Sequence, residues 1–234
     1  MAPRDFTSRL TRRATRVGLF LTDEVVEKLA TFYALLSRWN EKINLTSLDD
    51  PDAAIDRLIL EPLMATRYVP VGANRLMDVG SGGGSPAIPL KVAVPRLALT
   101  MVEVKARKSA FLREAVRQLE LEQAVVETTR IEELLAKPSL HEAFDLVTMR
   151  AVRVETSTLH TLQAFLKSGG QLFLFRGPHG PVVPQVVVPP LEFVDTYPLV
   201  DSLQSRLTAL SKRRVGSNAD VPRGTIAQRV DRPF

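Results

Sequence analysis

A glycine-rich turn after a short apolar run is the part of this sequence whose residues most clearly predict chemistry. Residues 76–90 read LMDVGSGGGSPAIPL, and Asp78 comes shortly before the glycines at positions 80, 82, 83 and 84. Glycine is needed where a backbone turns sharply from strand to helix and lies against a ligand without a Cβ in the way. We therefore expect a small-molecule site at the end of this strand.

Two classes of cofactor bind to a turn of this kind. A dinucleotide fingerprint that begins at Gly80 and Gly82 would need a third glycine at position 85, where the sequence has Ser85. Asp78 with Gly80, Gly82 and Gly84 instead gives D-x-G-x-G-x-G, which resembles motif I of class I methyltransferases. A carboxylate suits a ligand that carries an ammonium and a sulfonium, whereas it repels a pyrophosphate. We expect S-adenosylmethionine as the cofactor, and an NAD-dependent enzyme is the less favoured alternative.

Three later positions extend this predicted site. Glu103 ends the next apolar run, where a carboxylate can accept hydrogen bonds from both hydroxyls of a ribose, a feature shared with NAD enzymes. Ile131 and Glu132 follow a third run and can face an adenine ring. Arg150 ends the apolar segment FDLVTMR, and its guanidinium can bind the carboxylate of a methionine as a fork. Together these residues predict a nucleoside ligand with an amino-acid end.

Missing residues restrict the acceptor of the methyl group. After the strand that ends at Arg150 the sequence reads MRAV, without the N/D-P-P-Y/F loop common in amine methyltransferases, and the chain has no cysteine for covalent attack on a pyrimidine. The N7 atom of guanine has a free lone pair and needs no general base, so its methylation depends chiefly on positioning. We therefore assign no catalytic residue. With three histidines and no H-E-x-x-H motif, we expect no metal.

Basic residues suggest a polyanionic partner. Residues 1–22 carry a net charge of +4 and residues 205–234 carry +5, although the whole chain carries only +5. Arginine and lysine gain free energy when they release counterions from phosphates, although the chain ends can also be ordinary solvated segments. The candidate RNA-binding residues, with His179 beside them, are Arg107, Lys108, Arg176, Lys212, Arg213 and Arg214.

The elements that must position these residues alternate in type. We predict strands at 75–80, 97–104, 124–130, 144–150, 170–176, 191–199 and 205–212, and helices at 87–94, 105–119, 131–135 and 156–166. Alternation of this kind predicts a doubly wound, mostly parallel α/β sheet of seven strands, and the last two strands can form an antiparallel hairpin at its edge. Before the sheet, an amphipathic helix is expected over 22–47 and a second from Pro51 to about residue 67.

These patterns divide the chain of 234 residues into three parts. We expect a basic tail and helical cap at 1–70, a cofactor-binding domain at 71–215, and a basic irregular tail at 216–234. No apolar run is long enough to cross a bilayer, and the absence of cysteine suits a reducing compartment. We expect a monomeric cytoplasmic protein that does not bind membranes.

Four segments in order resemble the RsmG (GidB) family of small-subunit rRNA guanine-N7 methyltransferases. They are LLSRWNEKINLTS at 35–47, MDVGSGGGSPAIPL at 77–90, KARKSAFLREA at 105–115 and MRAV at 149–152. The resemblance implies methylation of the decoding-region loop of 16S rRNA, either free or in the small ribosomal subunit. The residues that it implies for S-adenosylmethionine are Gly80, Ser85, Glu103 with its neighbours Val104 and Lys105, Ile131, Glu132 and Arg150.

The sequence departs from the family pattern at two places. Ser85 stands where the family usually has an apolar residue, and RLILEP at 57–62 replaces an HFLDS-like run. An RNA-binding or ribosome-assembly factor with a degenerate cofactor pocket is therefore kept as an alternative function.

Overall fold

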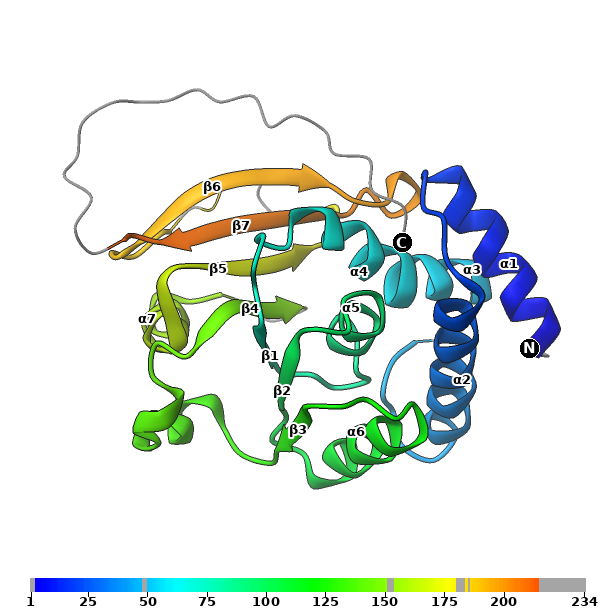
Figure 1. The fold of residues 1–234 in the computed structure, drawn as a ribbon, viewed down its shortest axis with the longest axis horizontal. Helices are drawn as coiled ribbons and strands as arrows, with labels where there is room; N and C mark the ends of the chain where they lie inside the picture. Colours follow the sequence, from blue (N-terminus) through cyan, green and yellow to red (C-terminus); the bar gives the residue numbers. More distant parts are fainter. Residues whose placement is uncertain (1–2, 48–49, 151–153, 180–183, 185, 215–234) are drawn as a thin grey trace.

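A twisted seven-stranded sheet forms the centre of the protein (Figure 1), whose computed structural model describes residues 3–47, 50–150, 154–179, 184 and 186–214. The strands are β1 Arg75–Val79, β2 Ala98–Val102, β3 Ala124–Glu127, β4 Phe144–Arg150, β5 Leu166–Arg176, β6 Leu191–Pro198 and β7 Arg206–Lys212. Their order in the sheet is β3-β2-β1-β4-β5-β7-β6, and β7 is antiparallel to both of its neighbours. The predicted doubly wound sheet and its terminal hairpin are confirmed.

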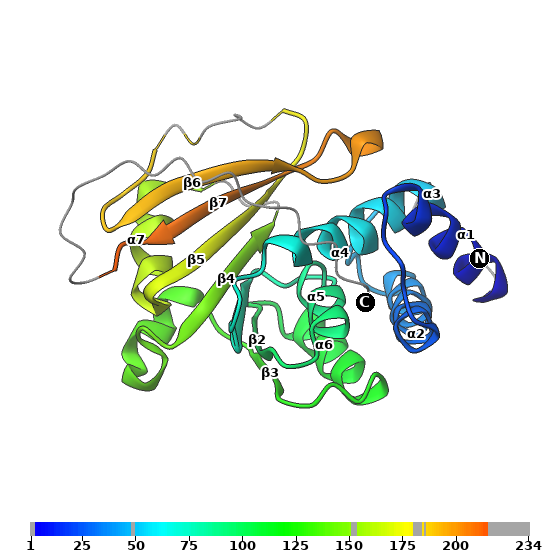
Figure 2. The ribbon, with the colours of Figure 1, turned by 45° about the horizontal axis from the view of Figure 1, so that its top comes forward.

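Helices cover both faces of this sheet (Figure 2). Helices α5 (Ala87–Ala93) and α6 (Ala106–Gln118) belong to the face that packs against the N-terminal helices, and α7 (Thr156–Phe165) lies on the other face. Successive side chains of a strand point to opposite faces, so Leu76 joins the first core and Met77 joins the second. A sheet buried on both sides explains why its central strands are almost continuously apolar.

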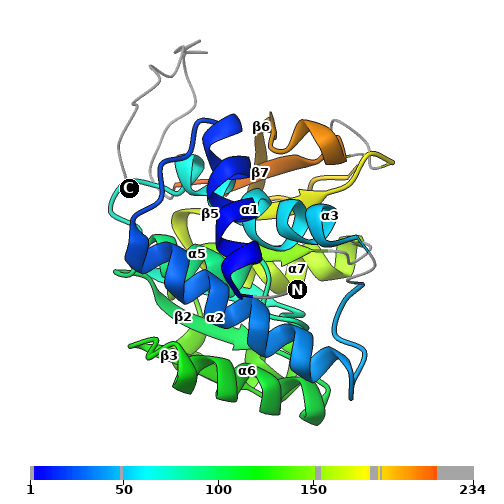
Figure 3. The same ribbon diagram turned by 90° about the vertical axis from the view of Figure 1, so that its right-hand side faces the viewer.

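The N-terminal segment is a helix, not the basic tail that we predicted. Helix α1 (Pro3–Arg16) buries Phe6, Leu10 and Ala14, which are four residues apart and so share one face. That face packs on α2 (Asp23–Asn40), where the Phe6 ring stacks on Tyr33 with centroids 4.6 Å apart (Figure 3). Of its arginines, Arg12 and Arg16 are exposed, whereas Arg9 and Arg13 form ion pairs with Asp52 and Asp56 of the following helices.

The two helices predicted after α1 have different limits from those expected. Helix α2 ends at Asn40, not at residue 47, because the Asn40 side chain accepts hydrogen bonds from the backbone N–H groups of Leu45 (2.8 Å) and Thr46 (3.0 Å) and so folds the chain into a turn. The single helix predicted over 51–67 is a succession of short elements. These are α3 (Pro51–Ile55), a π-helical turn (Asp56–Leu60), α4 (Glu61–Ala65) and a 3₁₀ turn (Thr66–Tyr68).

Other departures are small. The helix predicted at 131–135 is a 3₁₀ helix (Ile131–Ala136), and further 3₁₀ turns lie at Pro138–Leu140 and Asp201–Leu203. The predicted tail at 216–234 lies outside the described residues.

The cap helices and one face of the sheet share a single hydrophobic cluster, so the boundary predicted near residue 70 does not separate two cores. Among the helices that the structure describes, none is long and apolar enough to span a bilayer.

Candidate cofactor-binding site

The predicted site residues meet at the carboxyl edge of the sheet. Strand β1 pairs with β2 on one side and with β4 on the other, so the chain reverses its direction of winding at β1. In open α/β sheets, ligands bind beyond the carboxyl ends of the strands at this reversal point. Asp78 lies near the end of β1, Glu103 directly follows β2, and Arg150 ends β4.

The turn after β1 requires glycine at several positions. Gly80, Gly82 and Gly84 have φ angles of 75°, 50° and 82°, a region that other residues rarely adopt. At Gly84 a Cβ would also lie 2.6 Å from Ile88 Cδ1 and 3.2 Å from the Phe32 ring. Gly84 therefore lets the turn pack against the start of α5 and against the helical cap at the same time.

Glu103 holds this turn in place. Its side chain is buried, and its two carboxylate oxygens accept hydrogen bonds from the backbone N–H groups of Gly82 (2.9 Å) and Lys105 (2.8 Å). Each carboxylate oxygen has two lone pairs, so both oxygens keep acceptor capacity for the hydroxyls of a ribose. Glu103 thus has a structural role, as well as the ligand-binding role predicted from its position.

Asp78 is a buried carboxylate with one oxygen left over. Its Oδ1 accepts a hydrogen bond of 2.6 Å from Thr148 Oγ1, across the pairing of β1 with β4. Its Oδ2 has no hydrogen-bond partner among the described residues. Burial raises the pKa of the Asp78 carboxyl above its usual range, and the Thr148 hydrogen bond opposes this shift. A cation placed beside Oδ2 would compensate the buried charge.

Arg150 is enclosed by groups from the helical cap. Its Nη1 donates to the carbonyl of Arg57 (2.6 Å) and to Ser85 Oγ (3.1 Å), and its Nη2 lies 2.6 Å from Glu61 Oε2 in an ion pair that is not aligned as a hydrogen bond. The guanidinium also stacks over the Phe175 ring at 4.9 Å. Its Nε has no hydrogen-bond partner among the residues described. Desolvation lowers the pKa of Arg150, although Glu61 opposes this change.

Pro62 explains why cap carbonyls are available to this cluster. Proline has no N–H, so it cannot donate to Leu58 O in an α-helix or to Arg57 O in a π-helix. Ser85 Oγ donates to the Leu58 carbonyl at 2.8 Å, and Arg150 donates to the Arg57 carbonyl. The two departures from the family pattern, at Ser85 and in residues 57–62, are therefore joined by a hydrogen bond.

The unpartnered atoms of Asp78 and Arg150 fit the two ends of an amino acid. Asp78 Oδ2 is a buried acceptor and Arg150 Nε is a buried donor, and each residue acts electrostatically on the other. Buried polar groups in proteins are normally paired, so such atoms suggest a ligand that supplies the partners. An ammonium suits the first and a carboxylate suits the second, as in the methionine part of S-adenosylmethionine.

Ile131 and Glu132, which were predicted to face an adenine, and Val104 and Lys105, which were predicted to bind the cofactor, lie on the side of β2 and β3. Val104 is 54% exposed despite its apolar side chain. Ile131 is half-buried and Glu132 is exposed, in the first turn of the 3₁₀ helix that follows β3. Lys105 contributes its backbone N–H to Glu103, while its side chain is exposed. These residues leave apolar surface at the edge where the base of a nucleoside would lie.

The predicted RNA-binding residues divide between the two edges of the sheet. Arg107 and Lys108 lie in the first turn of α6, and Arg176 ends β5, so all three are at the carboxyl edge with the glycine turn. Burial lowers the pKa of Arg176. Lys212, Arg213 and Arg214 are at the opposite edge because β7 runs antiparallel to β5.

The prediction that Lys212, Arg213 and Arg214 lie beside the site was therefore wrong. Lys212 is the clearest case. Its buried ammonium donates to Glu142 Oε1 (2.7 Å) and to the carbonyls of Gln163 (2.9 Å) and Leu166 (3.0 Å). Arg213 is exposed and pairs with Glu192. These contacts give Lys212 a structural role in place of the predicted contact with phosphate.

The sequence prediction did not include Glu61 or Thr148. Thr148 belongs to an apolar strand, where a threonine has no distinctive signal before the pairing with Asp78 is known. Glu61 lies 89 positions before Arg150 in the chain, and no spacing rule connects them. Pro62 was a local signal, since a proline inside a predicted helix indicates freed carbonyls.

The fold and this site define a class I methyltransferase that uses S-adenosylmethionine. A methyltransferase of this kind from Aquifex aeolicus superposes with a TM-score of 0.53 at 14% identity, covering 75% of this chain and 97% of that one. A putative methyltransferase from Escherichia coli gives a TM-score of 0.51 at 14% identity, covering 73% and 91%. At such low identity the likeness concerns the fold.

Sequence comparison gives the family. Residues 25–180 match the model of the GidB family, rRNA small subunit methyltransferase G. The chain is 34% identical to the ribosomal RNA small subunit methyltransferase G of Syntrophotalea carbinolica, over 74% of this chain and 79% of that protein. It is 35% identical to the protein of the same name from Roseiflexus castenholzii, over 76% and 75%. The chain belongs to this family, which confirms the predicted resemblance.

Proposed function

We propose that this enzyme transfers a methyl group from S-adenosylmethionine to N7 of a guanine in the decoding-region loop of small-subunit rRNA. The observation that carries the proposal is the arrangement at the carboxyl edge, where the glycine turn follows the strand of Asp78, which has a buried acceptor, and Ser85 contacts Arg150, which has a buried donor. Membership of the rRNA small subunit methyltransferase G family supports the choice of rRNA. When bound, S-adenosylmethionine supplies an electrophilic methyl group on a sulfonium.

The residues of the chain then act by binding and positioning. Asp78 Oδ2 would accept a hydrogen bond from the ammonium and Arg150 Nε would donate one to the carboxylate, which would hold the methionine end. Glu103 accepts from the ribose hydroxyls while it holds Gly82 and Lys105. Val104, which is exposed, and Ile131, which is half-buried, would offer apolar surface to the adenine. No general base is assigned, because N7 of guanine carries no proton that must be removed.

The acceptor can be identified by labelling. Purified protein is incubated with S-adenosylmethionine carrying a labelled methyl group, and with either intact small subunits or free 16S rRNA. Recovery of the label in 7-methylguanosine after digestion to nucleosides is the expected result, and comparison of the two substrates shows which form is used. Label in another nucleoside would reject guanine N7, and no transfer to either RNA would reject the proposed function.

The same experiments address the alternative of an assembly factor with a degenerate pocket. A protein that binds rRNA without binding S-adenosylhomocysteine in calorimetry would support that alternative. The proposed enzyme acts in the cytoplasm, where ribosomal subunits assemble, and as a monomer. Light scattering of the purified protein tests the second statement.

A further inference from the structure

A hollow of about 470 Å³ lies between the helical cap and the cofactor-binding domain. Its walls come from the end of α2, from the residues just after it, and from the first turns of α6. The lining residues are Arg38, Trp39, Lys42, Ile43, Arg107 and Ala110, and we call this the cap hollow. Only Arg107 among them was predicted to bind RNA, so the cap contributes most of this surface.

The charged residues of the cap hollow are all cations, and none of them has an ion pair among the described residues. Within the described part of the chain, Arg38, Lys42 and Arg107 have no carboxylate at ion-pair distance. Arg117, farther along α6, is instead paired with Glu114 at 2.7 Å. The charge of Arg38 also acts on Glu114 of α6, but the carboxylate of Glu114 already accepts hydrogen bonds from Arg117 and Gln118. Three uncompensated cations around one hollow attract an anion.

The rest of the wall is apolar and partly flat. Trp39 is half-buried, and its ring meets Phe111 edge to face with centroids 5.9 Å apart, which holds it in one orientation. Ile43 and Ala110 complete this side. A flat aromatic surface beside cations is suited to a nucleotide, whose base or ribose packs on the ring while its phosphate meets the charges.

The chain segments that form the two walls of the cap hollow also contact or support the glycine turn. Leu45, two residues after Ile43, lies against the turn, since a Cβ on Gly83 would be 3.5 Å from the Leu45 carbonyl oxygen. On the other wall, the backbone of Lys105 donates to Glu103, which holds Gly82. The cap hollow is therefore built from segments that adjoin the glycine turn, while no residue of that turn lines it.

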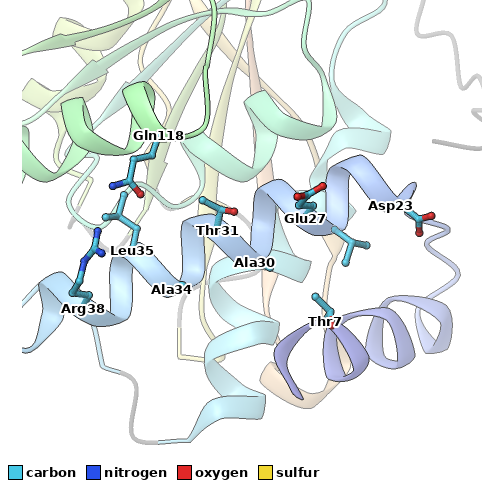
Figure 4. A pocket seen from close by; sticks show the side chains of 10 residues that line it. Thr7, Asp23, Glu27, Ala30, Thr31, Ala34, Leu35, Arg38 and Gln118 are labelled. Atoms are coloured by element: carbon cyan, nitrogen blue, oxygen red, sulfur yellow. The ribbon is translucent and has the colours of Figure 1, made fainter. Parts of the chain in front are cut away.

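A second hollow, which shares Arg38 with the cap hollow, carries negative charge at its far end. Arg38 also lines a second hollow of about 630 Å³ between α1, α2 and α6, with its side chain pointing toward α6 near Gln118 (Figure 4). Asp23 and Glu27 stand at the far end of this second hollow. The negative charges of Asp23 and Glu27 repel a polyanion. Of the two hollows, the cap hollow is therefore the one that attracts RNA.

We propose that the cap hollow binds a backbone phosphate, with its adjoining ribose or base, of the RNA next to the methylated guanine. The identification of the anion as RNA rests on the proposed function, whereas the anion site itself rests on the three cations. In this arrangement the helical cap and the first turn of α6 hold the substrate jointly, and the cap positions the guanine relative to the cofactor.

The test compares two triple variants of the full chain. Arg38→Gln with Lys42→Gln and Arg107→Gln neutralises the cap hollow. Lys28→Gln with Arg117→Gln and Lys137→Gln removes the same charge at exposed, ion-paired positions elsewhere. Binding of a fluorescently labelled decoding-region RNA is measured by anisotropy over a range of salt concentrations. Binding of S-adenosylhomocysteine is measured by calorimetry, and methyl transfer to small subunits is measured in parallel.

We expect the cap-hollow variant to bind the RNA about 10- to 100-fold more weakly than the control variant. Its plot of log affinity against log salt concentration should be shallower by about 2, as for three lost contacts with single-stranded RNA. Its affinity for S-adenosylhomocysteine should be unchanged. Equal RNA binding by the two variants would overturn the proposal, as would a loss of S-adenosylhomocysteine binding, which would indicate a structural effect.

The outcome is separable from that of the proposed function. If the wild-type protein methylates rRNA but the two variants bind and methylate alike, the function stands and the cap hollow is rejected. If the wild-type protein methylates nothing, the function is rejected, and the anisotropy comparison still decides whether the hollow binds RNA. Stronger binding of a labelled polyglutamate peptide than of RNA would assign the hollow to an acidic protein and so overturn the proposal.

Discussion

At the scale of single residues, the site contains the buried charged groups of Asp78 and Arg150, and among the described residues Asp78 Oδ2 and Arg150 Nε have neither a hydrogen bond nor an ion pair. Asp78 and Arg150 each use part of their hydrogen-bonding capacity inside the protein and keep one buried atom free among the described residues. Free atoms of opposite polarity make the site selective for a zwitterionic ligand end. Desolvation also makes each interaction stronger than it would be in water.

The raised pKa of Asp78 leads to a prediction about pH. Below that pKa the carboxyl is neutral and cannot pair with an ammonium, so the affinity for S-adenosylhomocysteine should fall as the pH drops through it, by up to about tenfold per unit. Calorimetry over a pH series measures this. Asp78→Asn should bind more weakly and without this dependence. The same pH dependence in Asp78→Asn would assign the titration to another group.

Removal of the charged side chain of Glu103 or of Arg150 should weaken ligand binding. Glu103→Ala and Arg150→Ala each remove a charged hydrogen-bonding group, which costs about 1.5–3 kcal/mol, or very roughly a ten- to hundredfold loss of affinity for S-adenosylhomocysteine. Arg75→Ala is the control, because Arg75 begins β1 at the other edge of the sheet. Unchanged calorimetric affinity in both Glu103→Ala and Arg150→Ala would refute the site assignment.

At the scale of elements, the cap is joined to the glycine turn by contacts that local sequence does not specify. The π-helical turn and Pro62 free two carbonyls, and residues from the turn and from β4 donate to them. A change in the cap helix therefore affects the hydroxyl of Ser85 and the guanidinium of Arg150. The hydroxyl of Ser85 is thereby provided with both an acceptor and a donor.

The link between Ser85 and Pro62 can be tested by a double-mutant cycle. Ser85→Ala removes the donor to the Leu58 carbonyl and should lower the free energy of unfolding by about 1–2 kcal/mol. In a Pro62→Ala background the new N–H can donate to that carbonyl, so the same substitution should cost less. Denaturant unfolding of the four proteins measures the difference. Equal costs in the two backgrounds would contradict this account of the carbonyls.

At the scale of the whole molecule, the direction of the last strand decides which basic residues face the substrate. Strand β7 runs antiparallel, so its carboxyl end lies at the edge away from the glycine turn. The cap hollow and Arg107 are at the edge with the cofactor site, whereas Lys212 and Arg213 are far from it. Net charge alone does not distinguish these two groups.

This arrangement predicts different effects of substitutions at the two edges. Lys212→Met removes three hydrogen bonds that a buried ammonium donates and should lower the melting temperature, while the affinity for rRNA stays within about twofold. Arg213→Ala, on the exposed surface, should change neither quantity appreciably. Thermal unfolding and RNA binding measure the two effects. A large loss of RNA affinity in folded Arg213→Ala would restore the opposite edge as an RNA surface.

The sequence by itself determined the class of fold, the glycine turn after Asp78 and the positions of Glu103 and Arg150 at strand ends. These follow from local patterns, because strand and helix periodicity and the need for glycine act over a few residues. The sequence also carried the family resemblance, which the comparisons confirmed.

Only the tertiary structure decided which distant groups meet. The ion pair of Glu61 with Arg150, the bond of Thr148 to Asp78 and the placement of Lys212 depend on strand order and on packing between segments far apart in the chain. Such contacts are set by which faces are buried together and by the direction of each strand. No pattern within a single segment encodes either of these.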